Sequence, residues 1–256
     1  GKHVLAHKAD IGFAFDGDGD RVGVVDNNGH EIFADKIGLL IARNLATEVS
    51  SSKFVIDVKS TSLFSTDEIL KKNNSEIIFW KTGHSYIKRK TSDINATAGF
   101  ERSGHFFFNN PIGRGYDDGI LSALEILKIL DNNEKQTISD LYNELTITFS
   151  SPTMSPKCPE ESKYKLVEKI EEIFQYKKKN NETVAGQKIL SILTVNGVRI
   201  HLEDGSWGLV RASSNSPNLV VVCESTISEE RMKEIFNDLN NELMKFNEIG
   251  EYDQKI

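Results

Sequence analysis

Residues 15–21 read Phe-Asp-Gly-Asp-Gly-Asp-Arg, and this short acidic stretch decides how the rest of the chain is interpreted. Its carboxylates, Asp16, Asp18 and Asp20, alternate with glycine, and like charges held this close repel one another unless a cation neutralises them. The glycines let the backbone curl so that the carboxylates face inward. Oxygen ligands at this spacing suit a hard divalent ion, with Mg²⁺ as the first choice. A solvated acidic turn is the alternative, but the apolar flanks "IGFAF" and "VGVVD" favour a metal loop between two buried strands.

Arg21, the residue after the last aspartate, indicates what kind of chemistry this loop serves. An EF-hand would need glycine at the sixth position and a bidentate acid at the twelfth. Here Arg21 and Asn27 occupy those positions, which excludes that kind of calcium loop. A guanidinium beside a metal can instead hold a phosphate through two parallel hydrogen bonds. The combination of metal ligands and Arg21 therefore indicates phosphoryl chemistry.

Composition and charge exclude several classes of protein. At 256 residues the chain is long enough for about two domains, and 38% hydrophobic with 27% charged residues is ordinary for a globular protein. The net charge of −7 argues against nucleic acid as a partner, because that needs an extended basic surface. Cys158 and Cys223 match no metal spacing and are expected to be reduced thiols. No apolar run reaches membrane-spanning length and no signal peptide is visible, so we expect a cytoplasmic protein with no membrane partner.

Strand and helix patterns divide the chain into four parts. Residues 1–30 read as the end of a truncated α/β domain that carries the metal loop, because the chain opens on Gly1 and reaches this loop almost at once. A central α/β domain, with a mixed sheet covered by helices, is expected over 31–148. Residues 149–160 hold three of the five prolines, which predicts an irregular linker. Residues 161–256 predict a smaller α+β domain with consecutive strands and a helix at either end.

Two single polar residues follow predicted strands of the central domain. Lys59 comes directly after "KFVIDV", at the carboxyl end of a strand, where open α/β sheets bind their ligands. His84 follows "EIIFW" and is expected to open the next helix after a turn at Gly83. Histidine is the side chain best suited to exchange protons near neutral pH. The alternatives are a solvated loop lysine and a packed or capping histidine.

Two longer polar loops interrupt strongly apolar stretches. The loop in "GFERSGHFFF" alternates hydrogen-bond donors and acceptors, which suits a polyhydroxylated substrate. In "GLVRASSNSPNLVVV", the guanidinium of Arg211 is followed by hydroxyl, amide and backbone donors that together form an anion cradle. A polar hairpin tip and a plain polar turn are the respective alternatives. A phosphorylated sugar would engage both loops as well as the metal loop. The side chains concerned are Glu101, Ser103 and His105 in the first loop, and Ser213, Ser214, Asn215 and Ser216 in the second.

These motifs, in this order, resemble the α-D-phosphohexomutase family, and most closely its phosphomannomutase/phosphoglucomutase branch. The resemblance covers essentially the whole chain. Members of this family have four domains, so the resemblance implies that the chain holds the end of the second domain, the third and the fourth. The missing N-terminal domain of the same protein would then be a partner.

The resemblance also implies a role for each candidate residue. Metal ligands for Mg²⁺ would be Asp16, Asp18 and Asp20. Catalytic residues would be Arg21 beside the reacting phosphate, Lys59, and His84 as general acid/base. Substrate-binding residues would be Glu101 and Ser103 on the sugar hydroxyls, His105 at the end of that loop, and Arg211, Ser213, Ser214 and Asn215 on the non-reacting phosphate. Ser214 departs from the usual cradle pattern, so which donor holds the phosphate stays open.

The implied reaction interconverts hexose 1-phosphate and hexose 6-phosphate, of mannose and/or glucose. A phosphoryl group would pass from an enzyme phosphoserine to the substrate through a bound hexose 1,6-bisphosphate. The family's serine lies in the first domain and no matching loop exists here, so we expect the isolated chain to be inactive. A phosphoglucosamine mutase and a non-catalytic sugar-phosphate-binding module are the alternatives.

Overall fold

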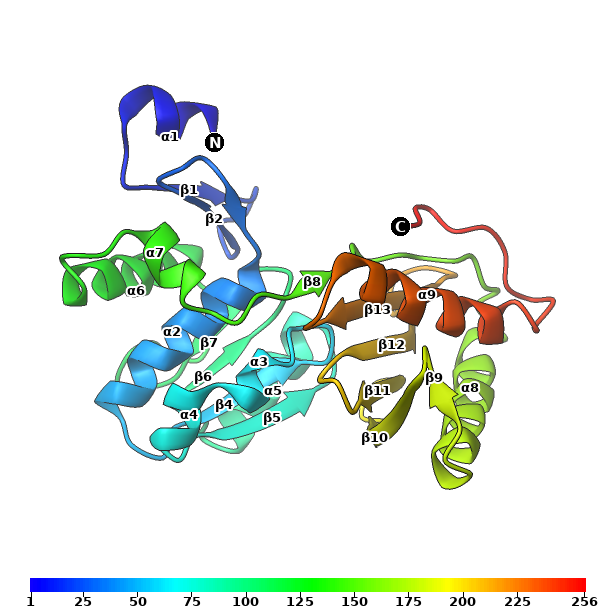
Figure 1. Ribbon diagram of the computed structural model, residues 1–256. Coiled ribbons are helices and arrows are strands. Elements are labelled where there is room, and N and C mark those ends of the chain that lie inside the picture. Colours follow the sequence, from blue (N-terminus) through cyan, green and yellow to red (C-terminus); the bar gives the residue numbers. More distant parts are fainter. The chain divides into compact units, whose positions relative to one another are not determined.

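The computed structural model describes every residue from Gly1 to Ile256, and the chain forms two compact units, Gly1–Thr146 and Ile147–Ile256 (Figure 1). Each unit has its own hydrophobic core. The first unit contains a small antiparallel sheet and a mixed sheet covered by helices, and the second packs helices on an antiparallel sheet. The predicted fold class, α/β followed by a smaller α+β domain, is confirmed. None of the helices combines the length and the hydropathy that a membrane span requires.

The acidic loop lies in a small antiparallel sheet near the start of the chain. This region consists of α1 (Lys2–His7), β1 (Ile11–Phe15), β2 (Val22–Asp26) and β3 (Glu31–Ile32). Phe15 at the end of β1 pairs with Val22 at the start of β2, so the loop is closed by a strand pair directly beneath it. The pattern "RVGVVDNNGHEIF" predicts a hairpin, which is confirmed: β2 pairs with β3 around a turn in which Asp26 Oδ1 accepts hydrogen bonds from two backbone N–H groups.

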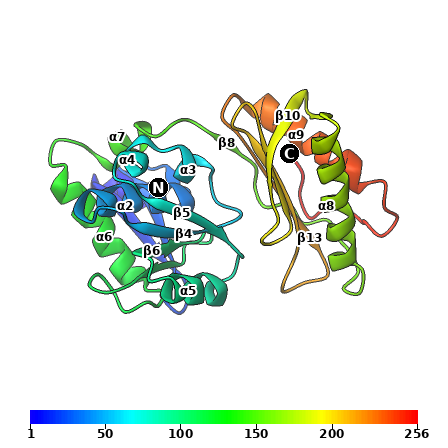
Figure 2. The ribbon, with the colours of Figure 1, turned by 90° about the horizontal axis from the view of Figure 1, so that it is seen from below.

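A four-stranded mixed sheet, ordered β5-β4-β6-β7, forms the centre of the first unit. Its strands are β4 (Lys53–Asp57), β5 (Glu76–Trp80), β6 (Ala98–Phe100) and β7 (Phe106–Phe108). The first three are parallel and β7 runs antiparallel to β6. Side chains alternate between the faces: Phe54 and Phe100 join the core on the side of α2 (Ala34–Glu48), whereas Val55 packs with Ile87 of α5 (His84–Asp93). Figure 2 shows these two helices on opposite sides of the sheet.

Two aspartates at helix starts have different roles from those that the pattern suggests. The helical pattern over 35–49 predicts Asp35 as the cap of α2, and this prediction is wrong. The N-cap is Phe33, with no side-chain hydrogen bond, and Asp35 is buried and accepts a hydrogen bond from the N–H of Thr61. The pattern in "TSLFSTDEILKK" predicts one helix, but Asp67 divides it by capping a second one. The remaining helices of this unit are α3 (Leu63–Thr66), α4 (Glu68–Lys72), α6 (Gly119–Asn132) and α7 (Ile138–Asn143).

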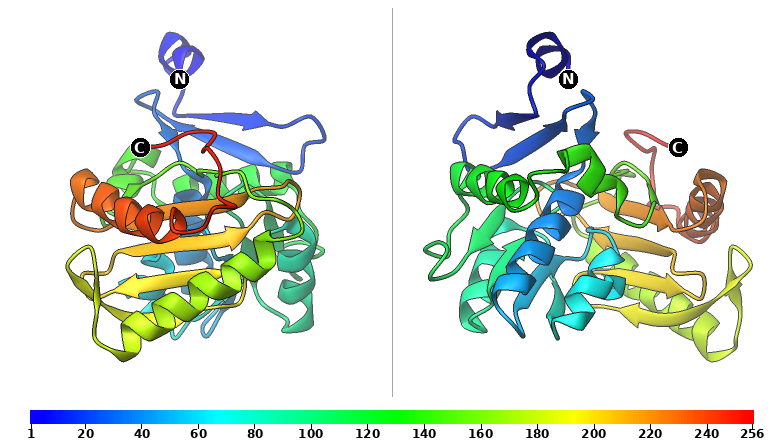
Figure 3. Two further views of the ribbon diagram at one scale, coloured as in Figure 1. Left: turned by 90° about the vertical axis from the view of Figure 1, so that its right-hand side faces the viewer. Right: turned by 60° about the vertical axis from the view of Figure 1, so that its left-hand side comes forward.

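The second unit is a six-stranded antiparallel sheet with two long helices on one face (Figure 3). The strand order is β8-β13-β12-β11-β10-β9. Ile170 and Phe174 of one helix, and Ile235 and Leu239 of the other, recur at helical spacing and fill the core. The elements are β8 (Phe149–Ser150), α8 (Lys163–Lys179), β9 (Thr183–Val184), β10 (Gln187–Leu193), β11 (Val198–Leu202), β12 (Trp207–Ala212), β13 (Leu219–Ser225) and α9 (Glu229–Leu243).

The proline-rich segment 149–160 belongs to this second unit. Met154 forms an isolated bridge with Val221 of β13, and Lys157 forms one with Asn218. The prolines interrupt the pairing but do not prevent it, because the residues between them still supply N–H groups. The structure divides the chain at Thr146, close to the expected end of the central domain at Thr148, and the four-part division itself stays a prediction.

Candidate active site

The three aspartates of the acidic loop lie close enough to share one cation. Asp16, Asp18 and Asp20 each offer a carboxylate oxygen, and these oxygens lie within 4.8 Å of one another. Gly19 adopts φ +77°, a left-handed conformation that favours glycine. Oδ1 of Asp20 is buried and accepts no hydrogen bond within the chain. Three converging carboxylate oxygens, one of them buried without a donor, fit a hard divalent cation such as Mg²⁺.

Arg21 closes the acidic loop and joins it to the polar loop after β6. Its Nε donates to Asp16 Oδ2 at 2.6 Å, and this hydrogen bond lowers the pKa of Asp16 to about 2. The guanidinium remains 46% exposed and can still meet a ligand. The backbone of Arg21 pairs with that of His105, and Val22 N–H donates to Gly104 O. The acidic loop and the predicted sugar loop are therefore neighbours, although more than eighty residues separate them in the sequence.

Glu101 organises the loop between β6 and β7. Its side chain is almost completely buried, and Oε1 accepts the N–H of Gly83 at 2.5 Å. Oε2 lies 3.0 Å from His105 Nδ1 and accepts the hydroxyl of Ser103 at 3.1 Å. Burial pushes the pKa of Glu101 upward, but the hydrogen bonds from His105 and Gly83 outweigh it and the pKa is lowered. Glu101 is therefore an ionised anchor for the loop.

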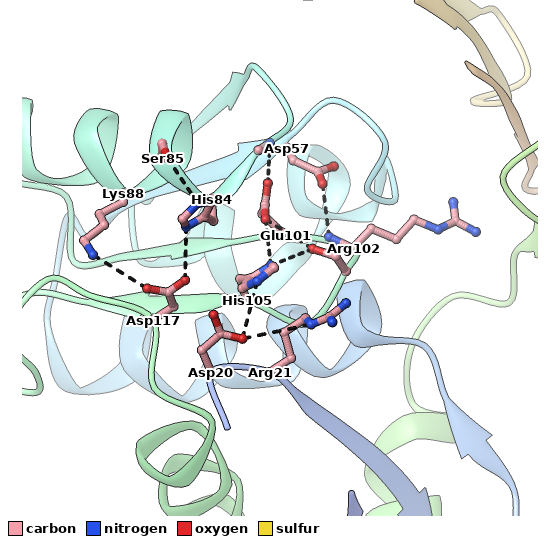
Figure 4. A network of polar contacts seen from close by, with 12 residues as sticks. Asp20, Arg21, Asp57, His84, Ser85, Lys88, Glu101, Arg102, His105 and Asp117 are labelled. Atoms are coloured by element: carbon pink, nitrogen blue, oxygen red, sulfur yellow. Dashed lines mark hydrogen bonds and ion pairs between the residues drawn. The ribbon is translucent and has the colours of Figure 1, made fainter. Parts of the chain in front are cut away.

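His105 is held by Glu101 on one side and faces the metal loop on the other (Figure 4). Its Nε2 lies 3.6 Å from Asp20 Oδ1. Burial pulls the pKa of His105 downward, yet Glu101, Asp20 and Asp117 together raise it. With Nδ1 directed at Glu101, Nε2 is the nitrogen free to exchange a proton with a ligand beside the metal loop.

His84 is the first residue of α5, as predicted, and lies beside His105 with 5.8 Å between the ring centroids. Its Nδ1 is 3.5 Å from Asp117 Oδ2, and its ring is more than half exposed. Asp117 also lies 3.7 Å from Lys88 Nζ. The two imidazoles thus each have a carboxylate partner, an arrangement that can orient a proton-transferring histidine.

Lys59 follows β4 at the carboxyl edge of the sheet, as predicted, next to a buried aspartate that the sequence reading missed. Asp57 Oδ1 accepts the N–H of Lys59 at 2.7 Å, and its Oδ2 accepts the N–H of Arg102 at 3.2 Å. Burial raises the pKa of Asp57, and Lys59 opposes that shift. Asp57 ties the Lys59 turn to the loop that carries Glu101, so both present their residues at one sheet edge.

The loop that the sequence predicts to be an anion cradle, residues 213–216, lies in the second unit. Arg211 is buried at the end of β12 and donates to Ala212 O at 2.8 Å. Ser213 N–H donates to Asn218 O, and Ser213 Oγ lies 2.9 Å from Ser216 Oγ, which closes the loop at its base. Ser214 and Asn215 are exposed at its tip. The Asn215 N–H donates back to Ser213 Oγ at 3.4 Å, so the loop is held by its own hydrogen bonds.

Three residues of these sites were not predicted from the sequence: Asp57, Asp117 and Lys163. Asp57 could have been found, because it ends a buried strand two residues before Lys59. Asp117 stands in a "DDG" run before α6, which reads as a helix start. Lys163 begins an amphipathic helix and carries no signal, yet its Nζ donates to Ser213 O and Ser216 O.

Family models match most of the chain. Residues 33–149 match the model described as phosphoglucomutase/phosphomannomutase, alpha/beta/alpha domain III, and residues 157–242 match the phosphoglucomutase/phosphomannomutase C-terminal domain.

Curated relatives agree with the family models. The phosphomannomutase/phosphoglucomutase of Pseudomonas aeruginosa is 35% identical over 92% of this chain and 48% of its own length. The phosphoglucomutase of Neisseria gonorrhoeae is 35% identical over 85% of this chain and 44% of its own length. The chain therefore spans about half the length of the curated relatives it matches.

Solved structures share the fold. A phosphoglucomutase/phosphomannomutase family protein from Burkholderia thailandensis superposes with a TM-score of 0.80 at 30% identity, covering 95% of this chain and 48% of that one. The Aspergillus fumigatus N-acetylphosphoglucosamine mutase, solved with GlcNAc-6P and magnesium, gives a TM-score of 0.63 at 16% identity over 91% of this chain and 48% of that one, which shows similarity of fold alone.

Proposed function

The chain belongs to the phosphoglucomutase/phosphomannomutase family, and from this premise we propose that it provides the metal-, sugar- and phosphate-binding parts of a phosphohexomutase. The reaction would interconvert the 1-phosphate and 6-phosphate of mannose and/or glucose. One observation carries the proposal: the pairing of Arg21 with His105 joins the acidic loop to the polar loop. The groups that we propose to meet the phosphate and those that we propose to meet the sugar hydroxyls therefore lie in one compact unit.

Asp16, Asp18 and Asp20 would hold Mg²⁺, since their oxygens converge and Oδ1 of Asp20 has no hydrogen-bond donor. When bound, the ion supplies positive charge beside a phosphate whose negative charge shifts during transfer. Arg21 adds a second, permanent positive charge next to the same position. The chain thus contributes charge neutralisation, which phosphoryl transfer needs more than it needs covalent chemistry.

His105 and His84 would accept the proton of the attacking sugar hydroxyl or donate a proton to the leaving one. The geometry favours His105 for this role, because Glu101 fixes its Nδ1 and its Nε2 faces the metal loop. His84 is more exposed and its contact with Asp117 is longer, so it would assist by binding the substrate. The exposed Ser103 hydroxyl would donate a hydrogen bond to a sugar hydroxyl or accept one from it, and the buried, ionised Glu101 could only accept one.

The cradle after Arg211 would bind the phosphate that is not being transferred. Exposed Ser214 and Asn215 offer donors at its tip. The Aspergillus fumigatus relative has been solved with glucose 1,6-bisphosphate, which carries a phosphate at each end. In this chain the cradle would bind one phosphate of a bisphosphorylated hexose.

The phosphoryl donor would be a phosphoserine in the N-terminal part that the full-length relatives contain. A mutase assay on the chain alone tests this, with mannose 1-phosphate as substrate and glucose 1,6-bisphosphate as activator. We expect no conversion to mannose 6-phosphate above the rate without protein. Steady turnover would contradict the proposal that the nucleophile is supplied from outside this chain.

A further inference from the structure

A buried lysine, Lys163, donates hydrogen bonds to two backbone carbonyls of the 213–216 loop, whose tip residues Ser214 and Asn215 are exposed. We propose that Lys163 is a positioning residue that holds the 213–216 loop in its anion-binding conformation. The inference rests on the proposed phosphate-binding role of that loop. Lys163 is the first residue of α8 and stands fifty residues before Ser213 in the sequence, so the contact is a tertiary one.

The Lys163 ammonium has three acceptors, and two of them are backbone carbonyls of the loop. Its side chain is 0% exposed. Nζ donates to Ser213 O at 2.6 Å and to Ser216 O at 3.1 Å, and it also donates to Glu160 Oε2 at 2.7 Å. An ammonium has three N–H groups, so these three contacts use all of them. Lys163 therefore has no N–H group left for a ligand, and it can affect a ligand only through the loop.

The contact with Glu160 does not by itself explain why a lysine is buried here. The Glu160 side chain is 61% exposed, and ion pairs with an exposed partner contribute little to stability. Burying an ammonium costs several kcal/mol unless its protons are all bonded. The two loop carbonyls complete that bonding, so the burial of Lys163 and the shape of the loop depend on each other.

Fixing a carbonyl also fixes the amide that follows it. The peptide bond is planar and trans, so the N–H of Ser214 points away from the Ser213 carbonyl oxygen. Because that oxygen is held by Lys163, the Ser214 N–H is directed toward the exposed side of the loop, where Ser214 and Asn215 lie. Arg211 holds the preceding carbonyl, that of Ala212, in the same way. Lys163 thus leaves the Ser214 N–H pointing away from the buried ammonium, where it can donate to an incoming phosphate, whereas the N–H that follows the Ala212 carbonyl already donates to Asn218 O.

The positive charge of Lys163 supports the same role. Its only carboxylate partner, Glu160, is on the solvent side and is screened by water. The two carbonyls are neutral, so part of the ammonium charge remains uncompensated within the loop. A phosphate bound at the tip would be attracted by that charge without touching it.

The test is a titration of the 256-residue chain and its Lys163→Met variant with glucose 1-phosphate, followed by calorimetry and by the backbone amide resonance of Ser214. We expect the variant to bind at least tenfold more weakly, with no ligand-induced shift of the Ser214 amide. Lys177→Met is the matched control, because Lys177 is a partly buried lysine of the same helix that pairs with Glu242 and contacts no part of the loop. It should bind as the natural chain does.

The two proposals can fail separately. If the natural chain does not bind glucose 1-phosphate, the proposed function fails, and inorganic phosphate as probe still reports on the Ser214 amide. A folded Lys163→Met variant that binds within twofold of the natural chain, with an unchanged Ser214 shift, would overturn the role of Lys163. If that variant does not fold, Lys163→Arg replaces it, since it keeps the charge but cannot place it at the same point between the two carbonyls. Natural affinity and a natural Ser214 shift in Lys163→Arg would equally overturn the inference.

Discussion

The two candidate sites are built with opposite charges and by opposite means. In the first unit, the buried carboxylate of Glu101 holds the imidazole of His105, and the carboxylate oxygens of the acidic loop converge around Asp20. In the second unit, the buried cations Arg211 and Lys163 hold backbone carbonyls. The first arrangement suits a cation and a proton, and the second suits an anion.

This difference predicts that damage to one site leaves the other intact, and the largest effect is expected at Glu101. Glu101→Ala removes the acceptor of the Gly83 N–H, the Ser103 hydroxyl and His105 at once. Leaving such groups unpaired should cost the first unit about 3 kcal/mol of unfolding free energy. Urea unfolding followed separately in the two units is the measurement. An equal loss in the second unit would show that the sites are not independent.

The next largest effect is expected on metal binding. Asp20→Asn keeps an oxygen but removes the charge, so Mg²⁺ affinity should fall about 100-fold in calorimetry. Asp10→Asn, which changes an exposed acid just before β1, should leave the affinity as it is. Phosphate binding at the second unit should not change in either variant. An unaltered Mg²⁺ affinity in the Asp20→Asn variant would contradict the proposal that the acidic loop binds the metal.

The units should also respond differently to mild acid. Burial, reinforced by Arg199, lowers the pKa of His201 in the second unit from 6.5 to about 3. Between pH 6.5 and pH 3 the unfolded chain binds a proton at His201 that the folded chain does not. The unfolding free energy is therefore unaffected by His201 above pH 6.5 and declines as pH falls below that value. By pH 5 the second unit should lose on the order of 2 kcal/mol. The pKa of Glu101 is lowered, so its contribution to the first unit persists throughout this range, above its unfolded value of 4.5.

His201→Gln should flatten this dependence, and His30→Gln, at an exposed histidine of the first unit, should not. Thermal unfolding of the second unit between pH 7 and pH 5 provides the comparison. A natural slope in the His201→Gln variant would assign the acid sensitivity to another group.

The smallest effect is expected at a glycine between the two loops of the first site. Gly104 has φ +95°, and an added Cβ would lie 3.0 Å from Val22 O. Gly104→Ala should therefore cost about 2 kcal/mol, from strain together with displacement of the neighbouring strand. Gly186→Ala in the second unit has φ +75° with open space around it, so it should cost only about 1 kcal/mol. Equal losses of unfolding free energy would mean that the contact with Val22 is unimportant.

The sequence predicts a site better when its contacts are made by side chains than when they are made by backbone atoms. The acidic loop and the polar loop act through side chains, and their residue types stand out against apolar flanks. Asp35 was assigned as a cap because a carboxylate at a helix start usually has that role, but a tertiary hydrogen bond with Thr61 took its place. Lys163 could not be predicted, because its partners are backbone carbonyls fifty residues away and backbone atoms leave no trace in a sequence.

The same reasoning applies to the proline-rich segment and to the joining of the two loops. Three prolines predict a linker, but the residues between them still pair: Met154 with Val221 of β13, and Lys157 with Asn218 just before it. Arg21 and His105 are close because the small sheet pairs with the residue just before β7. Local sequence patterns do not predict such a tertiary contact. Motifs could therefore be recognised one by one, while their geometry needed the fold.

The most direct test of the proposed function is a calorimetric titration of this chain with glucose 1-phosphate, carried out with and without Mg²⁺. The two sites together predict saturable binding that is tightened by Mg²⁺, with the sugar phosphate recovered unchanged afterwards. No binding under either condition would contradict the assignment of these loops to a sugar phosphate.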